Sequence, residues 1–303
     1  MSAIDFWLGR QRDTAADLPG ADLPWLVRLR EEAIDRFADE GWPTTRRENW
    51  RHTSLAFMAQ QALAVREAVA PEAVVADLRA RYRAALGTAQ DPARKAVESA
   101  GDDGHWVVFV DGHFAPALSA IGGLPGGVRI GSLADALGQT PEAVEAAFGQ
   151  AGDGEAPAAL NAALAADGAW IRLGRGVAVE PPIHLVFLTA TVADQHLRNL
   201  VVAEPGAQAT IVEHYPAGAA GSTLTTAVTR VLAAQDSHVT HLKLQQEAPE
   251  AIHLATIEAE QARGAVFASH SLSFGARLAR NDIRTRLAGE GAEVLLNGLY
   301  HAD

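Results

Sequence analysis

The sequence contains no cysteine among its 303 residues. A chain without cysteine forms no disulfide, has no thiol nucleophile and offers no thiolate ligand to zinc or to an iron–sulfur cluster. Lysine is almost as scarce, since Lys95 and Lys243 stand against 23 arginines. Neither lysine follows a glycine-rich loop, and no GxxxxGK[ST] phosphate-binding motif occurs. If the function uses ATP, we therefore expect another chain to hydrolyse it.

Basic residues are also fewer than acidic residues, so the formal net charge is −12. This charge argues against nucleic acid and against a polybasic membrane contact as partners. No apolar run is long enough to span a membrane, and the opening MSAIDFWLGR lacks the apolar region of a signal peptide. We therefore expect a cytoplasmic protein. With 48% hydrophobic residues, the chain can bury a sizeable core.

The first part of the chain, residues 1–100, is predicted to form an α-helical N-terminal domain. Residues 24–41 carry an apolar stripe at helical spacing and end at Gly41, a typical C-terminal cap. Pro71 opens a second predicted helix in the first-turn position that proline favours. Residues 88–104 are polar and glycine-rich, which predicts a linker.

Residues 101–166 are predicted to be a connecting region. Residues 105–116 (HWVVFVDGHFAP) indicate a β-hairpin around the Asp111-Gly112 turn. Three short helices are expected after it, at 132–138, 141–149 and 156–166.

From residue 167 to residue 303 the pattern changes to short alternating strands. Turn pairs begin 30, 30, 28 and 27 residues apart, at Gly176, Gly206, Asp236, Gly264 and Gly291. A right-handed parallel β-helix requires such a repeat, because every rung must turn at the same place, and glycine there allows rungs to stack closely. An antiparallel sandwich is the alternative, but it has no reason to repeat its turns in step. We therefore predict a mainly β protein with a β-helix core and a helical N-terminal region.

No group of residues predicts a catalytic centre. His238 and His241 are three apart, so a strand sends them to opposite faces. Glu213 and Tyr215 share a face, whereas His214 between them does not. No GxSxG nucleophile motif occurs, and GRGVAVE (174–180) lacks the third glycine of a dinucleotide site. The other strand histidines are expected at solvent-facing positions: His184, His196, His214, His253 and His270.

Several polar residues are set among the apolar residues of the strands. They are Arg198, Asn199, Arg277, Arg280, Asn281, Asp282 and Asn297. Two interpretations stay open for them. They either hydrogen-bond between neighbouring rungs, which we favour, or form a recognition surface for another subunit.

Four ordered stretches resemble the SufB/SufD family of iron–sulfur cluster assembly scaffold proteins. They are GWPTTRRENWRHTSL (41–55), ADGAWIRLGRGVAVEPPIHL (166–185), RNLVVAEPGAQATIVEHY (198–215) and ARNDIRTRLAGEGAEVLLNGLY (279–300). The matching positions are Pro43, Arg46, Glu48, Trp50, Gly176, Glu180, Asn199, Gly206, Glu213, Arg280, Asp282 and Gly291. The Glu213-His214 pair and the absence of cysteine look more like SufD than SufB.

The resemblance implies a non-catalytic scaffold subunit. Family members of the SufD type pair with SufB, and each binds one copy of the ATPase SufC, so that an iron–sulfur cluster is assembled on a SufBCD complex. We expect no cofactor, metal or catalytic residue in this chain itself. The competing hypothesis is a β-helix polysaccharide-active enzyme, which would need clustered carboxylates on an exposed sheet or at calcium sites.

Three structural expectations follow from the resemblance. Residues 43–55 should join helix to loop, with Trp50 in an apolar pocket and with Arg46, Arg47 and Glu48 paired locally. Family members continue beyond the Asn-Gly-Leu-Tyr stretch, so we expect the β-helix to be incomplete at its C-terminal side. The last strand would then offer an unpaired edge for self-association, and its candidate residues are Leu296, Asn297, Gly298 and Tyr300.

Overall fold

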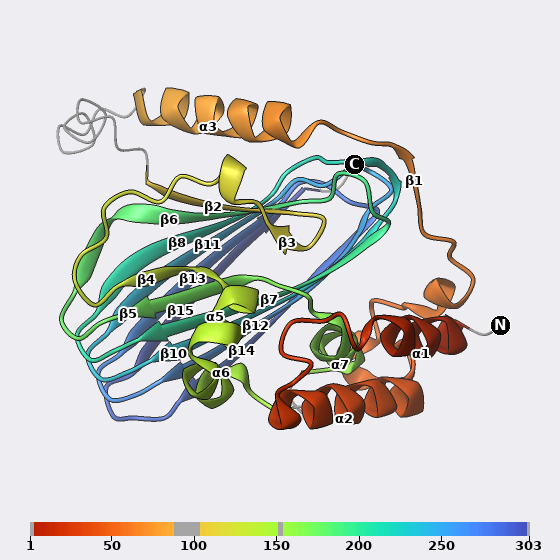
Figure 1. Ribbon diagram of the computed structural model, residues 1–303, viewed down its shortest axis with the longest axis horizontal. Helices are drawn as coiled ribbons and strands as arrows, with labels where there is room; N and C mark the ends of the chain where they lie inside the picture. The colour runs from red at the N-terminus through yellow and green to blue at the C-terminus, as the bar shows by residue number, and fades with distance from the viewer. Residues whose placement is uncertain (1–2, 88–103, 151–153, 302–303) are drawn as a thin grey trace.

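A computed structural model describes residues 3–87, 104–150 and 154–301. Its core is a parallel β-helix of about five turns, built from two facing sheets (Figure 1). One sheet has six strands in the order β14-β12-β10-β7-β5-β4, and the other has seven in the order β15-β13-β11-β8-β6-β2-β3. The predicted β-helix is therefore confirmed, and the sandwich alternative is wrong.

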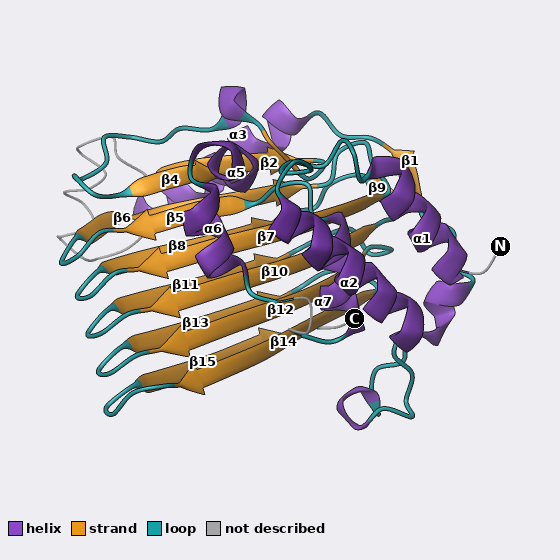
Figure 2. Ribbon diagram, turned by 60° about the horizontal axis from the view of Figure 1, so that its bottom comes forward, coloured by secondary structure: helices purple, strands orange, loops and turns teal. Residues whose placement is uncertain are grey.

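Each turn of the coil contributes one strand to each sheet, so successive rungs lie directly on one another (Figure 2). The successive pairs are β5 (Ala169–Leu173) with β6 (Ala178–Leu188), β7 (Asp194–Ala203) with β8 (Gln208–Tyr215), β10 (Leu224–Ala233) with β11 (His238–Gln245), β12 (Ile252–Gln261) with β13 (Val266–Ser273), and β14 (Leu278–Leu287) with β15 (Glu293–Tyr300). Neighbouring rungs pair in parallel without a register shift from β7 and β8 onward. Residues at equivalent positions therefore form straight columns.

The repeated turns stack as predicted. Gly176, Gly206, Gly264 and Gly291 all have φ between 66° and 74°, and Asp236 occupies the same place at 56°. The amide of Gly176 donates to the carbonyl of Pro205, and the amide of Gly264 donates to that of Glu290, each one rung further on. Positive φ strains any residue with a Cβ, which explains why glycine recurs in this column.

The segment between residues 104 and 150 supplies the first strands of both sheets. Strands β2 (His105–Val110) and β3 (His113–Phe114) form the predicted hairpin, and β2 also pairs in parallel with β6. Strand β4 (Arg129–Ser132) runs antiparallel to β5. A short 3₁₀ helix, η3 (Pro116–Leu118), lies between β3 and β4, and helices α5 (Leu133–Gln139) and α6 (Pro141–Phe148) follow as expected. The segment is thus continuous with the β-helix.

Helices cover the two sheets from outside (Figure 1). Helices α2 (Pro24–Glu40) and α7 (Ala156–Leu164) pack on the six-stranded side, with α1 (Ala3–Thr14) beside them. Helix α3 (Pro71–Gly87) lies on the opposite sheet. The predicted helices over 24–41 and from Pro71 are confirmed, whereas α1 was not predicted. Of the predicted linker at 88–104, all but Gly104 lies outside the described residues.

A connecting strap links these two helical layers. It contains the 3₁₀ turns η1 (Glu48–Trp50) and η2 (Ala56–Ala59) and the strand β1 (Ala64–Glu67), which pairs antiparallel with β9 (Ala220–Ser222). Within the described residues, no helix has the length and apolarity needed to cross a bilayer.

Candidate functional site

The interior of the β-helix changes from apolar to polar along its own strands. Inward positions near the glycine turns are apolar, as at Val179, Ala209, Val239 and Phe267. Two to six residues further along the middle strands, the inward positions become Glu213, Tyr215, His241, Lys243 and Gln245, and all five are buried. Buried ionisable groups are tolerated only when they are paired, so each of these side chains needs a partner.

Glu213 is the centre of the first cluster. Its carboxylate accepts a hydrogen bond from the Tyr215 hydroxyl at 2.9 Å and another from Thr229, and it lies 3.3 Å from His241 Nε2. Burial favours the neutral acid, but the charge and hydrogen bond of His241, the hydrogen bond from Thr229 and the charge of Lys243 outweigh it and lower the pKa of Glu213 to about 2. The prediction that Glu213 and Tyr215 act on one face is confirmed.

Lys243 joins this cluster to a second one. Its ammonium nitrogen is 2.5 Å from His253 Nε2 and 4.8 Å from the centroid of the Tyr215 ring. Burial lowers the pKa of Lys243 to about 8, although Glu213 and Glu247 oppose the shift. Burial and the Lys243 charge also lower the pKa of His253. His253 thus lies between the Lys243 ammonium on its Nε2 side and the Glu247 carboxylate on its Nδ1 side.

Glu247 ends the chain of polar contacts. It lies 2.7 Å from His253 Nδ1 and accepts from Thr225 at 2.6 Å and from Gln245 at 3.1 Å. Burial raises the pKa of Glu247, but the nearby charge of His253 and the hydrogen bonds from Thr225 and Gln245 outweigh this effect and lower it. Across the described residues, no three His, Cys, Asp or Glu side chains are grouped so that they could hold a metal ion. The arrangement holds fixed, mutually compensated charges inside the coil.

The solvent-facing positions expected for the strand histidines are wrong for four of them. His184, His196, His214 and His253 are buried, because helices cover the outer faces of the sheets and polar residues line part of the interior. His184 Nδ1 and His214 Nε2 lie 3.0 Å apart beneath α3, and the Trp106 ring stacks on His184 at 4.1 Å. Burial lowers the pKa of His214 to about 4.

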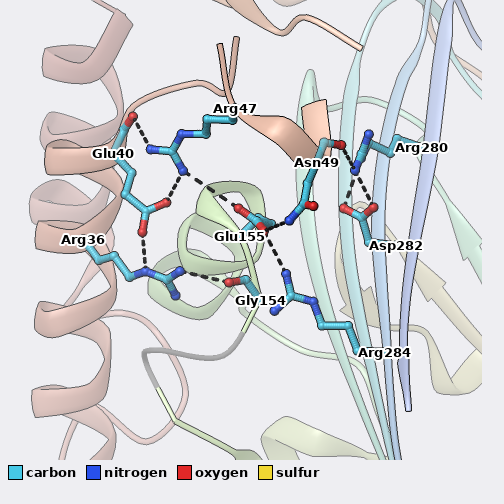
Figure 3. A network of polar contacts seen from close by, with 9 residues as sticks. All are labelled: Arg36, Glu40, Arg47, Asn49, Gly154, Glu155, Arg280, Asp282 and Arg284. Atoms are coloured by element: carbon cyan, nitrogen blue, oxygen red, sulfur yellow. Dashed lines mark hydrogen bonds and ion pairs between the residues drawn. The ribbon is translucent and has the colours of Figure 1, made fainter. Parts of the chain in front are cut away.

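The 43–55 stretch docks against strand β14 of the β-helix, so that two of the four family-like stretches meet there (Figure 3). Trp50 is buried in an apolar cluster, as expected. The Arg280 guanidinium lies 3.8 Å from the centroid of the Trp50 ring and donates to the Asn49 carbonyl at 2.8 Å. Asp282 orients the same guanidinium through a contact of 2.7 Å. Residues 230 positions apart thus form one unit, which neither motif indicates alone.

The local pairing expected for Arg46, Arg47 and Glu48 is confirmed for Glu48 and corrected for the two arginines. Arg47 reaches back to Glu40 in α2 at 2.7 Å, Glu48 pairs with Arg51 at 2.9 Å, and Arg46 is exposed. The segment turns back on itself where the Leu55 amide donates to the Pro43 carbonyl at 2.8 Å. Within the segment, Arg47 contacts α2, Asn49 contacts Glu155 just before α7, and Trp50 contacts β14.

The other motif residues occupy different places. Gly176, Gly206 and Gly291 form the turn column, and Glu180 is exposed on β6. Asn199 bridges three rungs, since its Oδ1 accepts from the Ala169 amide and its Nδ2 donates to Thr229. Pairing between rungs, the favoured interpretation, holds for Asn199.

Among the polar residues near the last rung, Asn297 pairs between rungs, and Arg277 and Arg280 fit neither interpretation. Asn297 pairs with His270 on the neighbouring strand at 3.1 Å. Arg277 and Arg280 bond instead to the N-terminal segment.

The last rung carries most of the exposed large apolar side chains of the described residues. Val294 packs toward the core, but Leu295, Leu296, Leu299 and Tyr300 are 51%, 44%, 57% and 84% exposed. The association expected at this edge stays a prediction, which sedimentation of residues 1–303 tests.

Comparison with known proteins matches the β-helix to one family. The N-terminal region of SufBD proteins matches residues 102–185, and the SufBD core domain of the SUF system for FeS cluster assembly matches residues 186–303. The chain belongs to the SufBD family. It is 28% identical over 276 residues to the iron–sulfur cluster assembly protein SufD of Escherichia coli and 27% identical over 281 residues to an iron–sulfur cluster assembly SufBD family protein of Synechocystis. Each alignment covers 89% of this chain and 58% of the relative, so the chain spans less than two thirds of the SufBD proteins it matches.

The sequence did not reveal the Lys243–His253–Glu247 chain. Alternation in HVTHLKLQ (238–245) does place His241, Lys243 and Gln245 on one face, which is a usable signal. It gives no reason to expect that face to be the interior, where charged side chains are rare.

Proposed function

We propose that the chain is a non-catalytic scaffold subunit that pairs with a SufB-type protein and a SufC-type ATPase to assemble iron–sulfur clusters. The observation that carries this proposal is the match of residues 102–303, which include every rung of the β-helix, to a family named for iron–sulfur cluster assembly. The iron–sulfur cluster is the cargo of the complex, and this chain supplies surface and geometry.

Two features of the site support the scaffold role. The ionisable groups of the interior are buried and satisfy one another, so they are placed to hold the coil together rather than to meet a substrate. The sequence also lacks both the thiol and the phosphate loop that sulfur transfer and ATP hydrolysis would need from this chain.

Co-expression tests the proposal directly. The tagged chain is produced with SufB-type and SufC-type proteins of the same organism, purified and sized, and the complex is assayed for cluster formation by its visible absorption. We expect a stoichiometric complex that forms a cluster, and no ATPase activity from the chain alone. An unrelated parallel β-helix protein with the same tag controls for adhesion through an exposed strand edge.

Two results contradict the proposal. One is that the partners are retained no better than by the control β-helix. The other is that the purified chain degrades pectin-like polysaccharides, which supports the enzyme hypothesis instead.

A further inference from the structure

A stack of rungs is held mainly by contacts between neighbours, so contacts that reach across several rungs add an independent constraint. The last described rung consists of β14 and β15. Strand β14 has an additional set of contacts that come from residues 47–61, more than 200 positions earlier in the sequence. Figure 3 shows the central part of this set.

Arg280 attaches the middle of β14 to the N-terminal segment. Its guanidinium is mostly buried, stacks on Trp50, donates to the Asn49 carbonyl and pairs with Asp282. A cation over an aromatic face and a charge-assisted hydrogen bond both gain strength from partial burial. Arg280 therefore makes one of the strongest contacts between the sheet and the N-terminal segment.

The start of β14 is held by a second arginine. Arg277 donates to the Gln61 side chain at 3.0 Å and lies 4.9 Å from the centroid of the Phe57 ring. Gln61 in turn donates to Ser222 in β9 at 2.8 Å. Since β9 leads into β10, this path connects the β10 and β14 levels without passing through β12, which lies between them in the sheet.

A third arginine completes the set further along β14. Arg284 donates to Glu155 Oε1 at 3.1 Å, and the Asn49 side chain donates to the same oxygen at 3.1 Å. Glu155 precedes α7 and also lies 3.8 Å from Arg47. Arg280 and Arg284 of β14, with Arg277 just before it, thus attach the strand to residues 49–61 and to the N-cap residue of α7.

We propose that residues 47–61 are a brace that holds the rung of β14 and β15 in register, with Arg277 and Arg280 as its attachment points. The brace bypasses the neighbour-to-neighbour order of the stack, because it connects β14 directly to α2, α7 and β9. It acts on β15 through the short turn at 288–292. It gives the 43–55 motif a role in positioning strands more than 200 residues later in the sequence.

Hydrogen–deuterium exchange of the intact chain tests the brace. Arg280→Ala removes the stacking and the hydrogen bond to Asn49. We expect amides of residues 278–300 to exchange about tenfold faster, the size expected for losing one or two partly buried charged contacts, while residues 224–245 keep their rates. Arg280→Lys keeps the cation but loses the forked contact with Asp282, so it should give an intermediate rate.

Arg286→Ala is the matched control. Arg286 lies on the same strand and pairs with Glu260 at 3.6 Å, but it is well exposed and remote from the Trp50 unit. Its loss should leave exchange in residues 278–300 within twofold of the wild type, as expected for an exposed ion pair. Equal rates for Arg280→Ala and Arg286→Ala overturn the proposal.

Arg277→Ala gives a second route if Arg280→Ala does not fold. It cuts the path through Gln61 and Phe57, and faster exchange confined to residues 278–300 again supports the brace. Acceleration spread evenly over all rungs overturns it, because that result describes a contact that stabilises the whole fold.

Discussion

The two halves of the β-helix interior differ in the chemistry of their packing, although the same strands pass through both. Near the glycine turns, apolar residues such as Val179 and Phe267 fill the space. In the other half, Glu213, Lys243 and His253 are buried in a connected polar chain. The apolar half gains stability from burial alone, whereas the polar half depends on every charge having its partner.

Stacking explains how the polar half is possible. Lys243 is the direct register partner of Glu213 on the next rung, and Gln245 is that of Tyr215. A column of equivalent positions places opposite charges about one strand spacing apart, roughly 4.8 Å, without any special loop. Charged side chains are usually excluded from a protein core. Here they are tolerated because an opposite charge on the neighbouring rung compensates each of them.

The largest effect is expected from removing the centre of the polar half. Glu213→Ala leaves His241 and Lys243 without their carboxylate in a buried site, so the free energy of unfolding should fall by about 3–5 kcal/mol. Ile211→Val, two residues earlier on the same face, should cost only about 0.5–1.5 kcal/mol. Chemical denaturation of both variants measures the contrast, and equal losses would remove the distinction between the halves.

Acid should weaken the polar half selectively. Glu213 has a pKa of about 2 in the folded chain against 4.5 as its ordinary value, so the unfolded chain binds the proton first as the pH falls. Its contribution is complete above pH 4.5 and disappears as the pH falls through about 2, a loss of about 3 kcal/mol. Urea denaturation between pH 5 and pH 2 should show this slope in Ile211→Val and a flatter one in Glu213→Gln.

A smaller effect is expected at the turn that closes the apolar half. Gly264 has a φ of 66°, and a Cβ there would meet Asp236 Oδ1 of the neighbouring turn. Gly264→Val should therefore lower the free energy of unfolding by about 1–3 kcal/mol. Gly298 has no atom within 4 Å of an added Cβ, so Gly298→Ala serves as the control. Thermal unfolding checks both, and a neutral Gly264→Val would show that the turn column is not constrained.

Much of the architecture could be predicted from local pattern. The turn spacing predicts stacked rungs, Asp111-Gly112 predicts a hairpin, and Gly41 predicts a helix end, because each depends on a few neighbouring residues. Helix α1 was not predicted, since its sequence carries only a weak apolar stripe. The buried histidines were misplaced because alternation tells which residues share a face but not what covers that face.

The sequence by itself determined the repeat of the β-helix, the positions of its turns and the resemblance to SufBD proteins. Those features depend only on local spacing and on short motifs. Only the tertiary structure decided that Trp50 meets Arg280 and that Glu213, Lys243 and His253 face one another inside the coil. Contacts between residues so far apart in the chain depend on how whole rungs and helices pack, and no local pattern specifies that packing.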